Sequence, residues 1–192
     1  MRKFSWGWIY NKPIFGGASL LDVGITAGTV AAGNDSRFLS DGTNPTFNTI
    51  TTSKVKITTE GGLAVKLTNK TGGASIKGYC VTTSDAENNA VKLVPIGEPN
   101  CIGVFYESGI ADSAEAWVVV AGIADVYFWD STVRGYLART GIAADTGEIS
   151  GQAVAEVVPS PPFATDKHFC EIGHVLETRT GAGLAKVVLH FN

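Results

Sequence analysis

The chain has 192 residues and a net charge of −3, with 17% charged and 44% hydrophobic residues. The hydrophobic content excludes an intrinsically disordered chain, and the lack of a concentrated basic stretch excludes a face that would neutralise nucleic-acid phosphates. Twenty-three glycines and few charges are typical of short strands joined by tight turns, not of helix bundles.

Residues 1–48 predict an extended N-terminal arm, or attachment segment. Aromatic residues crowd the first fifteen positions, and glycines punctuate the rest of this segment. Aromatic side chains provide a large contact area at a modest entropic cost, which suits packing on the chain's own domain or docking on a neighbouring subunit. We assign to a docking cluster Phe4, Trp6, Trp8, Tyr10 and Phe15.

The sequence predicts neither membrane insertion nor a disulfide framework. The longest nearly apolar run, 116–128, contains Asp125 and is shorter than the about 20 residues that a span needs. Lys12 and Pro13 interrupt the apolar stretch near the start, so we expect no cleaved signal segment. An odd number of widely spaced cysteines predicts buried free thiols made in a reducing cytoplasm. They are Cys80, Cys101 and Cys170.

Residues 49–192 predict one β domain. Apolar and polar residues alternate over 63–68, and a turn at 69–73 predicts a hairpin with 75–82. Residues 117–121 are continuously apolar, as in a strand buried on both faces, and a further strand, 123–129, comes after Gly122.

The end of the chain also alternates with period two. Residues 185–191 predict a strand, which a turn at 180–183 separates from another strand at 171–178. About ten short strands and no convincing helix predict an all-β fold, an antiparallel sandwich or barrel with an extended N-terminal arm.

One short pattern recurs at an offset of 70 residues. Ile102-Gly103, followed by Glu107, returns as Ile172-Gly173, followed by Glu177, and residues 117–119 align with residues 187–189. Both units predict a strand, a turn and an apolar strand. Two interpretations stay open: chance similarity between hairpins, or hairpins in equivalent places of one barrel or sandwich.

No metal or cofactor site is predicted. His168, Cys170 and His174 share one face of an extended strand, and Glu171 is expected on the opposite face. Tetrahedral zinc needs about four ligands, so this set is incomplete.

No catalytic residue is predicted either. Carboxylates at Glu107, Asp112, Glu115 and Asp125 are the residue types that cleave glycosidic bonds, but acidic residues in loops are mostly solvated. Residues 181–186 begin like a dinucleotide fingerprint, yet they precede a strand where that motif needs a helix. The sequence therefore predicts a protein that is not an enzyme.

Two segments resemble bacteriophage proteins. Residues 28–38 resemble a short element of many phage fibre proteins, which lies near the segment that links an attachment region to a trimeric part. Residues 49–192 resemble phage head decoration and head-fibre proteins through Ile102-Gly103-Val104, 117–126 and 172–189.

The resemblance implies a β-barrel or sandwich that oligomerises, often as a trimer, on the exterior of the virion, with the major capsid protein and further copies of itself as partners. It implies no catalytic residue. Two alternatives stay open. A tail fibre or receptor-binding adhesin would recognise a host-surface glycan or protein, and a glycan-cleaving depolymerase would carry a carboxylate pair in a groove.

Overall fold

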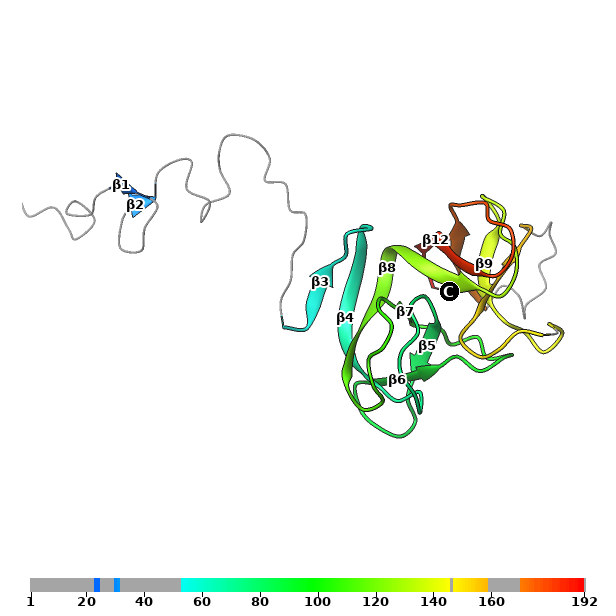
Figure 1. Cartoon of the computed structure of the whole chain (residues 1–192), viewed down its shortest axis with the longest axis horizontal. Helices are drawn as coiled ribbons and strands as arrows, with labels where there is room; N and C mark the ends of the chain where they lie inside the picture. The colour runs from blue at the N-terminus through cyan, green and yellow to red at the C-terminus, as the bar shows by residue number, and fades with distance from the viewer. Residues whose placement is uncertain (1–22, 25–29, 32–52, 146, 159–169, 192) are drawn as a thin grey trace, which may run out of the picture. The chain divides into compact units, whose positions relative to one another are not determined.

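The computed structural model describes residues 23–24, 30–31, 53–145, 147–158 and 170–191 (Figure 1). The chain separates into two units, Met1–Phe47 and Asn48–Asn192. In the first unit, β1 (Val23–Gly24) and β2 (Val30–Ala31) pair in parallel. The described residues of the second unit form strands without helices, so they hold no helix that could span a membrane. The all-β fold predicted from the sequence is confirmed, and its described strands pair mostly antiparallel, with two parallel pairings in the large sheet.

The described residues of the second unit form ten strands in one sheet. They are β3 (Val55–Ile57), β4 (Gly62–Asn69), β5 (Cys80–Thr83), β6 (Ala90–Leu93), β7 (Gly103–Phe105), β8 (Glu115–Phe128), β9 (Leu137–Thr140), β10 (Ala153–Glu156), β11 (Glu171–Val175) and β12 (Gly183–Leu189).

The strand pairings close into two rings that share β8. In the first ring, β4, β8, β7, β5 and β6 pair in that order, and β6 returns to β4. In the second ring, β8, β12, β11, β9 and β10 pair in that order, and β10 returns to β8. Figure 1 shows β8 passing from the strands of the first ring to β12. Gly122 stands at the change of ring with a φ of 81°, a conformation that glycine adopts without strain.

The two rings repeat one topology, strand for strand. Each has four antiparallel pairings and closes with a parallel one, Asn69 beside Val91 in the first ring and Phe128 beside Ala153 in the second. β7 and β11 therefore occupy equivalent places, as do the first half of β8 and β12. The sequence pattern that recurs therefore lies in equivalent hairpins. These hairpins belong to two successive rings and not to a single barrel or sandwich.

The pairing register shows that the offset between the two hairpins differs by one residue between their two strands. Val104 pairs with Val119, and His174 pairs with Val188 in the equivalent hairpin. The offset is therefore 70 residues in the first strand of the hairpin and 69 in the second.

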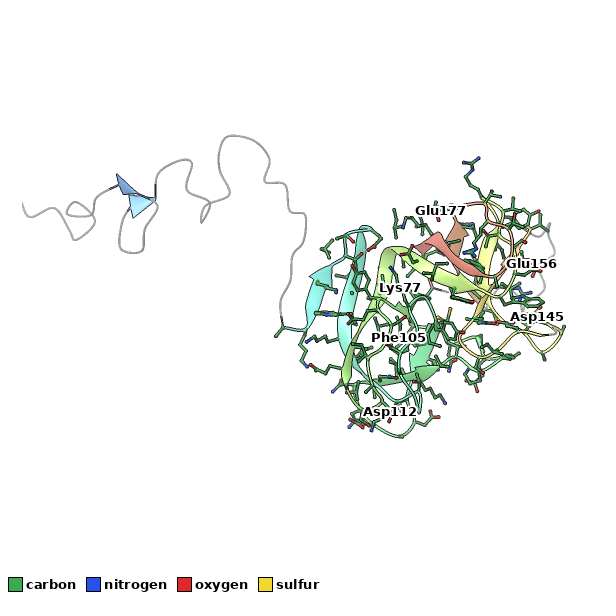
Figure 2. The ribbon with its side chains drawn as sticks, viewed as in Figure 1. Lys77, Phe105, Asp112, Asp145, Glu156 and Glu177 are labelled. Atoms are coloured by element: carbon green, nitrogen blue, oxygen red, sulfur yellow. The ribbon has the colours of Figure 1, made fainter. Side chains whose placement is uncertain are left out.

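Two buried clusters correspond to the rings. The first ring is filled by side chains from all around it, with Phe105 (Figure 2) fully buried among them. The second cluster joins the inside of the second ring, such as Val126 and Val187, to the outer face of the first ring, such as Val104 and Val119. The second ring thus covers one face of the first by burial of apolar surface. The three cysteines are buried and free, as predicted.

Two sequence predictions of strand organisation are wrong. β4 pairs with β3, β6 and β8, and does not form a hairpin with residues 75–82. The buried Asn69 side chain donates to the carbonyl oxygens of Gly73 and Ile110, at 2.8 and 2.9 Å, and so turns the chain into a loop instead of a tight hairpin turn. Residues 117–121 and 123–129 belong to one strand, because Gly122 bends β8 without ending it.

Candidate functional site

The predicted docking cluster lies outside the described residues. Phe4, Trp6, Trp8, Tyr10 and Phe15 all precede the first described strand. The cluster and the arm of residues 1–48 therefore stay predictions.

The residues that were considered for a metal site are divided by the structure. His168 lies outside the described residues, Cys170 is buried and His174 is exposed on β11. The prediction that Glu171 faces away from His174 is wrong. A register shift between Glu171 and Gly173 breaks the alternation of the strand, so Glu171 and His174 lie on one side.

Two of the four carboxylates considered for glycoside hydrolysis, Asp125 and Glu115, pair with different lysines. Asp125 lies between Lys77 and Lys186, with Nζ to Oδ distances of 2.8 and 2.9 Å. Burial works against the charge of Asp125, but the two lysine hydrogen bonds outweigh it and lower the pKa of its carboxyl. Glu115, at the start of β8, pairs with Lys54.

The remaining two carboxylates, Glu107 and Asp112, lie in the segment between β7 and β8. Asp112, in a loop (Figure 2), accepts a hydrogen bond from the amide of Gly72 at 2.8 Å. Asp125 and Glu115 thus have lysine partners within the domain, and Asp112 has a backbone partner in a neighbouring loop.

A lysine–aromatic cluster lies at the edge of the first ring, and sequence reasoning missed it. It consists of Lys56, Lys66, Lys77, Tyr106 and Trp117. The Lys56 ammonium is 3.9 Å from the Tyr106 ring centre and 4.7 Å from that of Trp117, and Lys66 lies 5.2 Å from Trp117. Such cation–π contacts contribute about 0.5–1 kcal/mol each at exposed sites.

The lysines of this cluster are unequal in their electrostatics. Burial lowers the pKa of Lys56, because it disfavours the charged ammonium. The hydrogen bond to Asp125 raises the pKa of Lys77. β3 and β4 each carry one of these lysines, Lys56 and Lys66, but the strand register that brings both beside Trp117 is not visible in the sequence. A half-buried surface of Tyr, Trp and Lys stems suits contact with another protein.

A buried ion network joins strands of the second ring. Arg139, on β9, is 4% exposed, and its guanidinium meets Glu156 at 2.6 Å and Asp145 at 2.7 and 3.0 Å (Figure 2). Burial opposes the charge of Arg139, but the hydrogen bonds with Asp145 and Glu156 outweigh it and raise the pKa of the guanidinium. The two carboxylates come from β10 and from the loop after β9, so the arginine ties these segments together.

Glu148 completes the network as a nearly buried acid. It is 7% exposed, and its carboxyl lies against Gly141, where any larger residue would overlap it. Burial, reinforced by the negative charge of Asp145, raises the pKa of Glu148 to about 7.

Replacing Glu148 by glutamine should remove a pH dependence of stability. The pKa of about 7 in the folded chain lies above the ordinary 4.5, so the folded chain holds the proton of this carboxyl more tightly than the unfolded chain does. The stability of the folded chain that depends on this proton is fully present below pH 4.5 and is lost as the pH rises through 7. We expect Glu148→Gln to be more stable than wild type by about 1–3 kcal/mol near pH 8. Urea unfolding of both proteins near pH 4.5 and near pH 8 measures the difference in the free energy of unfolding. An exposed control, Glu87→Gln, should leave the profile unchanged, and a Glu148→Gln profile that keeps the wild-type slope would contradict the assignment.

Comparison with known proteins gives no relative: no protein-family model, curated protein or solved structure matches the chain.

Proposed function

We propose that this chain is a structural protein on the exterior of a bacteriophage virion, a decoration or head-fibre protein that binds the major capsid protein and stabilises the capsid. Its chemistry is binding, without catalysis. The observation that carries the proposal is the arrangement of the three segments that resemble phage head proteins. The third segment lies far from the first two in the sequence, yet all three form neighbouring strands.

These segments follow one another through the sheet. Ile102-Gly103-Val104 leads into β7, residues 117–126 lie in β8, and residues 172–189 contain β11 and β12. β7 pairs with β8, β8 pairs with β12, and β12 pairs with β11. The segments that carry the resemblance therefore form one continuous run of paired strands that crosses both rings. Because this run is a property of the fold, it supports an architecture shared with phage head proteins over a coincidence of short motifs.

The surface supports a role in protein contacts. Large apolar side chains are more than a third exposed at many positions of the described domain, on a chain of low charge. Such surfaces and the lysine–aromatic cluster suit packing against other subunits. The exposed apolar residues are Val55, Leu63, Ile76, Ile96, Val133, Ile149, Val157, Val158, Leu176, Leu184 and Val188.

Attachment and assembly follow from the same proposal. The aromatic segment, Phe4 to Phe15, docks on the capsid, and the β domain associates into a closed homotrimer that suits a capsid symmetry axis. A protein that binds assembled capsomers but not dissociated ones stabilises the shell by mass action. The lysine partners of Asp125 and Glu115 favour this role over glycan cleavage. A tail adhesin would differ from it in location and copy number.

Copy number and location in the particle test the proposal. Imaging of intact virions, with this chain quantified against the major capsid protein, should find hundreds of copies spread over the shell, as lattice binding requires. A few copies confined to the tail would overturn the decoration role and identify an adhesin. Absence of the chain from purified virions would overturn a structural role altogether.

A further inference from the structure

We propose that Glu171, His174 and His190 form a binding site for a zinc ion, with a fourth coordination position open to solvent. We call these three residues the Glu–His–His site. It goes beyond the proposed capsid role and does not depend on it. Two imidazoles and one carboxylate are a donor set that zinc uses in proteins, with a water completing the coordination.

The distances within the site fit a single ion. His190 Nε2 is 3.4 Å from Glu171 Oε1, and His174 Nε2 is 3.9 Å from the same oxygen. All three ligand atoms lie within 4.8 Å of one another. Tetrahedral zinc with bonds of about 2.0–2.1 Å separates neighbouring ligand atoms by about 3.4 Å, so small rotations of the imidazoles suffice.

The backbone holds the three residues in place. β11 is an interior strand of the second ring, where His174 pairs with Leu137 on one side and Val188 on the other. The amide of His190 donates to the carbonyl of Ile172 at 3.0 Å. The register shift after Glu171 brings its carboxylate to the side of His174. A site carried by paired strands loses little conformational freedom when an ion binds.

Exposure differs among the ligands in a way that suits an open site. The Glu171 side chain is 9% exposed, whereas those of His174 and His190 are 48% and 43% exposed. A nearly buried carboxylate at the base and two half-exposed imidazoles at the rim leave the ion accessible from solvent. The imidazole rings, with centres 4.9 Å apart, are tilted by 44° and do not stack face to face.

The repeated topology indicates that the fold itself does not require these polar residues. The first ring places Cys101 and Val104 at the positions equivalent to Glu171 and His174, and both are buried in the apolar cluster between the rings. The same hairpin therefore forms with apolar side chains. In the second ring this face carries the three ligands instead, which is why we infer a binding role for them.

Metal titration of the full-length chain, freed of metal by a chelator, tests the site. Calorimetry with Zn²⁺ should give one ion per chain. Co²⁺ should give visible bands of a low-symmetry nitrogen–oxygen site, without a thiolate charge-transfer band, because the three cysteines are buried and none belongs to the ligand group. Saturating Zn²⁺ should raise the unfolding temperature, since binding stabilises the folded chain.

Variants separate this site from adventitious binding. His174→Ala and His190→Ala remove half-exposed side chains, and each should weaken Zn²⁺ binding by at least about tenfold. Glu171→Gln, which preserves the shape of the side chain, should do the same, and Glu87→Gln should bind like wild type. Circular dichroism checks that each variant is folded. Failure of wild type to bind Zn²⁺ saturably, wild-type affinity in both histidine variants, or a thiolate band with Co²⁺ would overturn the proposal.

Discussion

Replacing Arg139 by methionine should lower the free energy of unfolding by about 3–5 kcal/mol, because it leaves acidic groups without their buried cation. The carboxylates of Asp145 and Glu156 both accept hydrogen bonds from the Arg139 guanidinium. The nearly buried Glu148 lies beside Asp145. Methionine fills much of the volume but supplies no charge. Urea unfolding of the two proteins at neutral pH measures the loss.

Two further variants make this result interpretable. Arg134→Met removes an exposed arginine near the same strands and should change stability by no more than about 0.5 kcal/mol. Adding Asp145→Asn and Glu156→Gln to Arg139→Met should recover part of the loss, because the uncompensated charges disappear with their cation. A loss in Arg139→Met no larger than that in Arg134→Met would contradict a stabilising role for the network.

The sequence predicted the strands well wherever local pattern decides them. Alternation over 63–68 and 185–191 and the apolar run at 117–121 correspond to parts of β4, β12 and β8. Only over 185–191 does the period of two report which face of the strand is buried. In β4 the alternation predicts a strand but not its buried face, because Leu63 is exposed and Ala64 is fully buried. The fold class followed from these strands, because no segment offered a helical period.

Ring closure could not be predicted from local pattern. β4 and β6 are joined by a parallel pairing of two residues, and β8 and β10 by a pairing of one. Such short contacts between separated segments leave no periodic signal. Gly122 was identified as a bend, but whether it ends a strand or carries one strand into two rings depends on both sets of partners.

The polar sites were missed for related reasons. The partners of Arg139 become neighbours only through the pairing of β9 with β10 and the loop that joins them. The Glu–His–His site depends on a register shift that reverses the side on which Glu171 lies. Strict alternation placed Glu171 on the wrong face, because a bulge adds a residue to one strand only.

Replacing Gly173 by alanine should lower the free energy of unfolding by about 3–5 kcal/mol, because backbone strain and steric overlap act together. Gly173 has a φ of 153°, and a Cβ atom there would overlap the carbonyl oxygen of Val188 on β12. The overlapped atom belongs to a paired strand, so it cannot move without loosening the second ring. Urea unfolding measures the change, and weaker Zn²⁺ binding should accompany it, because the same bulge orients Glu171.

Two other glycines provide matched comparisons. Gly103 is the equivalent residue of the first ring, where a Cβ would lie 2.7 Å from the Val119 carbonyl oxygen and where φ is not positive. Gly103→Ala therefore lacks the backbone strain and should destabilise less than Gly173→Ala. A Cβ at Gly73 meets no atom within 4 Å, so Gly73→Ala should change stability by no more than about 0.5 kcal/mol. If Gly173→Ala is no more destabilising than Gly73→Ala, the bulge is not a fixed part of the fold, and the placement of Glu171 beside the histidines loses its structural basis.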